Sequence, residues 1–80
     1  MKVGTEVELE PAEHWDSRIN LALMMGLKVT GEISNKFEYE DETVLFIDHM
    51  SVGGDAVPCV AWVIEPNAQN CLNVIGEKTF

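Results

Sequence analysis

The feature that most restricts the fold is an alternation of apolar and polar residues with a period of two. It is strict from Val3 to Leu9, where one side of the chain is largely apolar and the other carries Glu6 and Glu8. It returns after Gly26. A period of two is that of a β-strand with one buried face, so most of the chain is expected to form strands. The exposed side of the first strand is expected to be acidic.

Further strands are predicted wherever β-rich runs are bounded by polar or glycine-marked turns. The turns are expected at Glu40–Glu42, at Ser51–Asp55 and at Pro66–Asn67. The last of these would join two neighbouring strands as a hairpin. The strands that follow the first one are expected to cover residues 27–39, 43–48, 57–64 and 71–75.

One segment departs from the period of two and has the spacing of a helix. Trp15 and Ile19 lie four positions apart, as they would on one face of a helix, and Pro11 suits a first helical position. Gly26 is well placed to end the helix. A single substantial helix is therefore predicted over residues 11–25.

Together these elements predict an α+β fold. The expected architecture is an antiparallel, largely meandering sheet of about five or six strands, with one helix, residues 11–25, packed on one face. A chain of 80 residues is short for more than one hydrophobic core, so residues 1–80 are expected to form a single domain.

Two of the predicted strands, residues 43–48 and 57–64, are apolar on both faces. Such strands need cover on both sides, and one helix covers only one. A strongly curled sheet, a second copy of the chain or a bound partner would shield the other face. If that face stays open, Phe46 and Trp62 form an apolar patch rimmed by carboxylates, which is typical of an interaction site.

Charge narrows the range of functions. The chain has 14 Asp and Glu against 5 Lys and Arg, a net charge of −9, yet 46% of its residues are apolar. This apolar content excludes a disordered acidic tail, and the shortage of cations excludes binding to nucleic-acid phosphates. With no run of about 20 apolar residues and no apolar leader, the expected location is the cytoplasm. Cys59 and Cys71 are expected to stay unbridged, as in a reducing compartment.

The carboxylates form two groups. The denser one places four of them in five positions, and in an extended strand alternate members would share a face about 6.6 Å apart, comparable with successive phosphates of a nucleic acid. An edge strand protected from aggregation by its charge is the simpler interpretation. The residues predicted to bind a partner are Glu38, Glu40, Asp41 and Glu42 as the main group, with Glu6, Glu8, Glu10 and Glu13 as a second row.

No metal, cofactor or catalytic site is expected. Neither acidic segment has the order of a calcium loop, and the residues that could bind zinc, His14, His49, Cys59 and Cys71, are widely scattered. Asp48 and His49 are adjacent on a predicted strand, so their side chains diverge instead of pairing. Because the chain also lacks a nucleophile elbow and a phosphate-binding glycine loop, it is predicted to be non-enzymatic.

A small, strongly acidic α+β chain with rows of carboxylates and no catalytic motif resembles the DNA-mimic inhibitors of phages and mobile elements. These include anti-CRISPR proteins, anti-restriction proteins and the uracil-DNA glycosylase inhibitor. Under half of the chain is similar, in order and character, to the C-terminal hairpins of the last of these. The similar segments are Val44–Ile47, Pro58, Ala61–Ile64 and Asn67 to Asn70.

The resemblance implies an inhibitor found in the host-cell cytoplasm. Such a protein would bind the cationic nucleic-acid-binding groove of a target, such as a CRISPR-Cas complex or a DNA-processing enzyme, and block DNA binding by mimicry. The alternative is a small interaction or regulatory subunit, or a homodimer, that docks through an apolar sheet face around Trp62 and Phe46.

Overall fold

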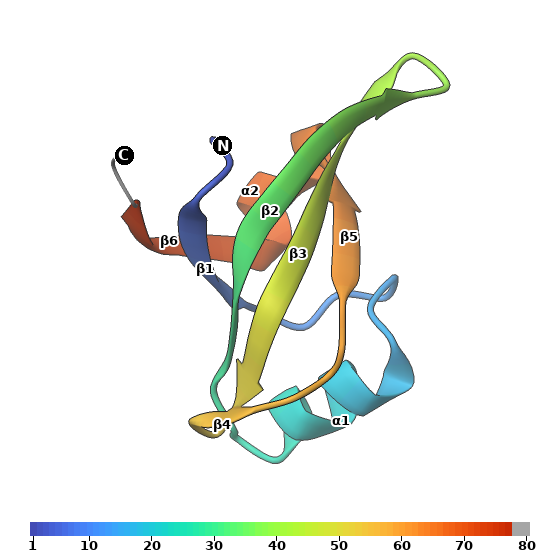
Figure 1. The fold of residues 1–80 in the computed structure, drawn as a ribbon. Coiled ribbons are helices and arrows are strands. Elements are labelled where there is room, and N and C mark those ends of the chain that lie inside the picture. Colours follow the sequence, from blue (N-terminus) through green and yellow to red (C-terminus); the bar gives the residue numbers. More distant parts are fainter. Residues whose placement is uncertain (78–80) are drawn as a thin grey trace.

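The computed structural model describes residues 1–77, and within them six strands form one antiparallel sheet. The strand order is β4-β3-β2-β1-β6, and β5 also pairs with β3 (Figure 1). The elements, in chain order, are β1 (Thr5–Leu9), α1 (Ser17–Met24), β2 (Val29–Tyr39), β3 (Glu42–Val52), β4 (Asp55–Ala56), β5 (Ala61–Ile64), α2 (Glu65–Cys71) and β6 (Leu72–Glu77).

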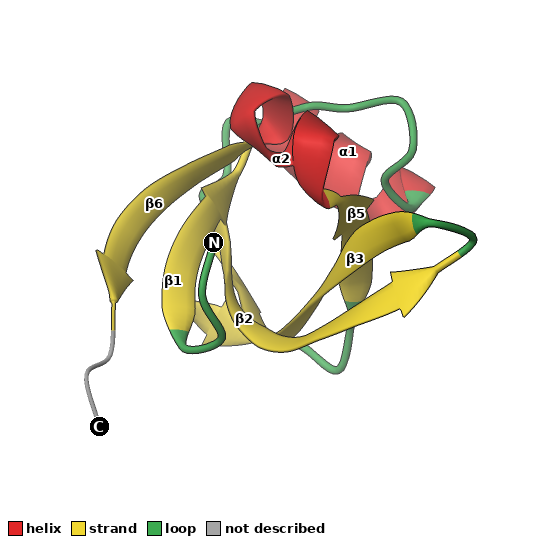
Figure 2. Cartoon of the chain, turned by 90° about the horizontal axis from the view of Figure 1, so that it is seen from above, coloured by secondary structure: helices red, strands yellow, loops and turns green. Residues whose placement is uncertain are grey.

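The sheet is curled around an interior (Figure 2). Two register shifts between β2 and β3, at Thr30/Glu32 and at Ile33/Asn35, interrupt the longest pairing of the sheet. Such bulges bend strands and increase their twist. The helix α2 spans the gap in the curled sheet, because it joins the end of β5, which pairs with β3, to the start of β6, which pairs with β1.

A single hydrophobic cluster fills the concave side of the sheet, and both helices contribute to it. The alternation of β1 places Val7 and Leu9 inside, and α1 adds Ile19 and Ala22. The cluster consists of Val7, Leu9, Trp15, Ile19, Ala22, Val29, Ile33, Leu45, Ile47, Met50, Ala61, Val63, Ala68, Cys71 and Leu72.

The predicted α+β class and the antiparallel sheet are confirmed, but the predicted helix bounds, residues 11–25, are wrong, and the helix is not the only one in the described chain. The helix α1 covers only Ser17–Met24. It begins late because the Asp16 carboxylate accepts a hydrogen bond from the backbone N–H of Arg18 at 2.8 Å and so caps the helix there. The preceding residues form a loop, held where the indole of Trp15 donates to the backbone oxygen of Glu10 at 2.7 Å.

The predicted turn at Pro66–Asn67 is also wrong, because these residues belong to the second helix, α2. Proline is favoured in a first helical turn, where no partner for its missing N–H is needed, and Glu65 suits the positive end of the helix dipole. Ala68 and Cys71, three residues apart, lie on one face and are buried. After the helix, β6 pairs with β1 and not with β5, so the sheet is not a continuous meander.

Candidate binding surfaces

The acidic group at residues 38–42 lies at the end of the β2–β3 hairpin, which projects beyond the rest of the sheet (Figure 1). Glu40 and Asp41 form the two-residue turn, with φ angles of 48° and 65°, and Tyr39 pairs with Glu42 beneath it. Two positive φ angles in succession fit a type I′ turn. The predicted straight row of carboxylates is therefore wrong: Glu38 and Glu42 lie on different strands, and the four acids surround a tip.

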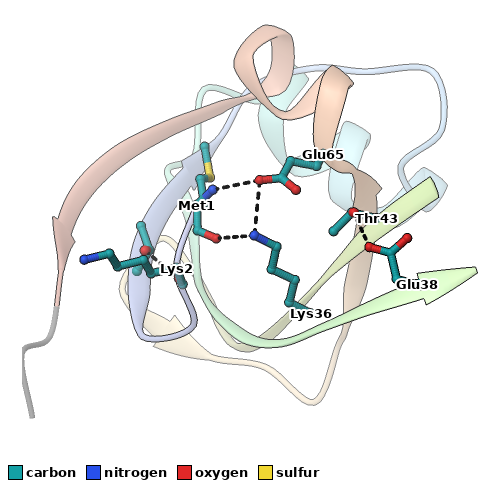
Figure 3. A network of polar contacts seen from close by, with 7 residues as sticks. Met1, Lys2, Lys36, Glu38, Thr43 and Glu65 are labelled. Carbon is teal, nitrogen blue, oxygen red and sulfur yellow. Dashed lines mark hydrogen bonds and ion pairs between the residues drawn. The ribbon is translucent and has the colours of Figure 1, made fainter. Parts of the chain in front are cut away.

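The negative charge of this tip is not neutralised within residues 1–77. Glu38 accepts a hydrogen bond from the Thr43 hydroxyl at 2.6 Å (Figure 3). Glu40, Asp41 and Glu42 are exposed and form no ion pair in the described part of the chain. We call these four residues, Glu38, Glu40, Asp41 and Glu42, the acidic tip.

The lysine nearest to the acidic tip in sequence, Lys36, is directed to another carboxylate. Its Nζ lies 3.3 Å from Oε1 of Glu65, and the same oxygen lies 3.1 Å from the Met1 ammonium (Figure 3). The hydrogen bond from the Met1 ammonium lowers the pKa of Glu65, and Lys36 lowers it further. The cation therefore compensates Glu65 and leaves the acidic tip uncompensated.

The second predicted row lies on β1, away from the acidic tip (Figure 1). Glu6 and Glu8 share the outer face of that strand, as the alternation predicted, and both are half-buried. Glu8 lies 3.7 Å from Nζ of Lys28, and Glu10 accepts a hydrogen bond from the Asn73 amide at 2.8 Å. The structure thus does not unite the two predicted groups, and part of the second has partners within the chain.

Glu13 lies still further along the chain, in the exposed loop between β1 and α1. The helix predicted over residues 11–25 would have included it in its first turn, but α1 begins only at Ser17. Its carboxylate therefore does not extend the row on β1 into a helix start.

Sequence reasoning missed two carboxylates that the sheet brings together. Glu6 on β1 is paired with Glu32 on β2, and Glu32 is paired with Asp48 on β3. The three therefore lie side by side across the outer face, because directly paired residues project on the same side. The alternation of β2 indicated that Glu32 faces outward, but only the strand register places it beside the other two.

An open hollow of about 270 Å³ adjoins this group, lined in part by Glu6, Glu32 and His49. His49 has a φ of 50° where β3 carries an extra residue opposite β2, and its backbone N–H donates to the Asp48 carboxylate at 2.7 Å. Within the described residues, no three His, Cys, Asp or Glu side chains gather closely enough to hold a metal ion.

The outer face of β2, β3 and β5 is apolar between the acidic groups. Phe46 is paired directly with Trp62, and Val44 with both Phe37 and Ile64. Val44 is only 8% exposed and yet lies outside the core cluster, because its neighbours on the outer face cover it. We call these five residues, Phe37, Val44, Phe46, Trp62 and Ile64, the outer apolar band.

Trp62 is the most exposed member of the outer apolar band, at 52%. The imidazole of His14, from the loop before α1, lies 6.0 Å from its ring and 4.1 Å from the ring of Trp15, measured between centroids. Trp15 is buried, so the His14 imidazole lies between the exposed ring of Trp62 and a tryptophan ring that is fixed in the core. Of the two aromatic residues expected on an open face, Trp62 is thus exposed and Phe46 is half-buried beside it.

We compared the chain with models of protein families, with curated proteins and with solved structures, and found no match in any of the three. No helix in residues 1–77 is both long enough and apolar enough to cross a membrane.

Proposed function

We propose that this protein is a non-catalytic, acidic binding protein that occupies the cationic nucleic-acid-binding surface of a target and so competes with DNA. The observation that carries the proposal is the acidic tip: four carboxylates at the end of a projecting hairpin, without a compensating cation in the described chain. Guanidinium and ammonium groups that contact phosphates in the target would contact these carboxylates instead.

The geometry of the hairpin turn supports this proposal. Glutamate is disfavoured at positive φ, which aspartate tolerates better but less well than glycine, and four neighbouring carboxylates repel one another. A turn chosen for stability alone would carry Asn-Gly, whereas this one carries Glu40 and Asp41. The acidic residues therefore reduce the stability of the hairpin, which fits selection for an external cationic partner.

A second candidate function is that of a small docking subunit or homodimer. It is favoured by the outer apolar band, in which Trp62 is half exposed beside Phe46. In this case the negative charge would keep the free protein soluble, and the apolar contact would supply the affinity.

The test is capture from a bacterial cell lysate by the immobilised chain, followed by elution with duplex DNA. The purified target would then be assayed for DNA binding with and without the protein. The triple variant Glu40→Gln/Asp41→Asn/Glu42→Gln should lose both capture and competition. Capture by the wild type should weaken as salt rises, because exposed charges are screened over about 10 Å at 0.1 M salt.

Two aspartates provide a matched control. Asp41 lies in the hairpin turn, and Asp55 lies at the start of β4, after the turn at the opposite end of β3; both are exposed. Asp41→Asn should weaken competition with DNA, whereas Asp55→Asn, with the same change in charge, should not. A target that Trp62→Ala loses and the triple variant keeps, without release by DNA, would overturn mimicry in favour of docking.

A further inference from the structure

The outer apolar band lies between two acidic zones on the same face of the sheet. Along β3, the residues that face outward are Glu42, Val44, Phe46 and Asp48 in succession. At a rise of about 3.3 Å per residue, the first and last of these lie about 20 Å apart. A stripe across the molecule therefore has carboxylates at both ends and apolar side chains between them.

The carboxylates at the two ends are available to an external cation. Glu42 is exposed, and Asp48 is half-buried with one oxygen accepting the backbone N–H of His49. Neither forms an ion pair in the part of the chain that the structure describes. Each is beside further acids, since Glu42 belongs to the acidic tip and Asp48 is paired with Glu32.

We infer that this stripe is a docking surface for a basic amphipathic helix of the target, with its apolar centre on Phe46 and Trp62 and arginine or lysine at each end. The inference rests on the proposed function in one respect, that the target is cationic. A helix of about 14 residues is about 21 Å long and 10–12 Å wide. The three strands β2, β3 and β5 offer a face of similar size, about 10 Å between the outer two.

Charge and ring chemistry together select this occupant. Aromatic residues on an open sheet face can also stack the bases of single-stranded nucleic acid, but such sites combine them with a positively charged groove. Here both flanks of the aromatic residues are acidic, and the whole chain carries a net charge of −9. A second copy would bring like-charged zones together. Arginine, by contrast, can stack on Trp62 while its neighbours reach the flanking carboxylates.

The test uses two synthetic helical peptides of identical composition, each about 14 residues long to match the stripe. One has two arginines at each end and leucine and alanine between them; the other has all four arginines in the centre. Fluorescence anisotropy at 0.15 M salt should show that the end-charged peptide has a dissociation constant about tenfold lower than the centre-charged peptide. A tenfold difference is what a single additional favourable contact typically contributes. Labelled oligo(dT) serves as the single-stranded nucleic-acid probe.

Variants locate the peptide on the face. Trp62→Ala should weaken binding of the end-charged peptide by about tenfold or more, as for a central aromatic anchor. Glu42→Gln/Asp48→Asn should remove its preference over the other peptide. Leu21→Ala, which truncates a 57% exposed residue on α1, should leave binding unchanged. Urea unfolding of each variant establishes that the losses are not due to unfolding.

The results separate this inference from the proposed function. Equal affinity for both peptides, unchanged binding by Trp62→Ala, binding of oligo(dT), or a dimer in sedimentation equilibrium that Trp62→Ala dissociates would each overturn the inference. Glu40→Gln/Asp41→Asn should leave peptide binding intact, because these residues lie beyond the stripe, and yet should reduce competition with DNA. Loss of DNA competition alone therefore tests the acidic tip, and loss of peptide preference alone tests the stripe.

Discussion

Lys36 and Glu65 are 29 residues apart in the chain, and their charged atoms, Nζ and Oε1, lie 3.3 Å apart across the open end of the curled sheet. The Met1 ammonium shares the same carboxylate oxygen at 3.1 Å. These contacts connect three parts of the chain, namely the N-terminus, β2 and the start of α2. Glu65 thereby joins the beginning of α2 to the long hairpin.

The first prediction concerns the pH dependence of this contact. The hydrogen bond from the Met1 ammonium, together with Lys36, lowers the pKa of Glu65 in the folded state. The ionised Glu65 carboxylate therefore stabilises the fold fully above its unfolded pKa, about 4.3. This stabilisation is lost as the pH falls through the lower pKa of the folded state. The difference in free energy of unfolding between wild type and Glu65→Gln should be largest near neutral pH and shrink on acidification. Urea titrations across this range measure it. Asp55→Asn corrects for the loss of one negative charge, and a difference that grows in acid would contradict the prediction.

A second prediction concerns the close approach of β2 to β3. A Cβ built on Gly31 would lie 2.5 Å from Cγ2 of Ile47, which is fully buried and branched at its own Cβ. Gly31→Ala should therefore lower the free energy of unfolding by about 1–3 kcal/mol, the usual cost of overpacking a core. Gly76→Ala is the matched strand control, since no atom lies within 4 Å of its Cβ. Equal urea midpoints for the two variants would contradict this account.

A third prediction separates stability from binding at the hairpin turn. Replacing Glu40 and Asp41 by Asn and Gly supplies the preferred type I′ pair, and it should raise the free energy of unfolding by about 1 kcal/mol as left-handed strain is relieved. The same variant should compete less well with DNA for the target, since two tip carboxylates are gone. Urea unfolding and the competition assay, run on the same preparation, give the two values. A variant that is both more stable and fully competent would show that these two carboxylates do not contact the target.

The parts of the fold that the sequence predicted are those set by local periodicity. The alternation in β1 placed Val7 inside and Glu6 outside, because a strand has only two faces. The pairing of β6 with β1, in contrast, joins residues 63 to 72 positions apart, and no local pattern encodes it. Pro66 was mispredicted for a different reason, since proline suits a turn and the first turn of a helix equally well.

For the candidate surfaces too, local sequence predicted some residues, whereas the arrangement in space depended on the fold. The four carboxylates of the acidic tip were found by their density in the sequence, but their arrangement depends on where the turn falls, and the turn falls at Glu40 and Asp41. Glu32 and Asp48 were not selected because each is isolated in the sequence and joins the other only through strand register. Composition thus identified the kind of surface, and pairing determined its shape.

The last prediction concerns the two thiols, which lie on different elements and are both free. Cys71 is 3% exposed, its Sγ donates to the backbone oxygen of Asn67 at 3.4 Å, and burial raises the pKa of its thiol. Cys59 is half-buried and borders a small apolar hollow beside α1. The thiolate is the reactive form of a cysteine. A disulfide reagent near neutral pH should therefore modify Cys59 first, and Cys71 should react at least about tenfold more slowly.

Single serine variants assign the two kinetic phases. Cys59→Ser should abolish the fast phase and Cys71→Ser the slow one, while in concentrated guanidinium chloride the two thiols of the wild type should react at similar rates. Raising the pH above the pKa of an ordinary thiol, about 8.5, should accelerate the slow Cys71 phase, since burial raises the pKa of its thiol. Equal native rates would mean that α2 opens on the timescale of the reaction. The packing of Ala68 and Cys71 against the core would then stabilise α2 less than their burial indicates.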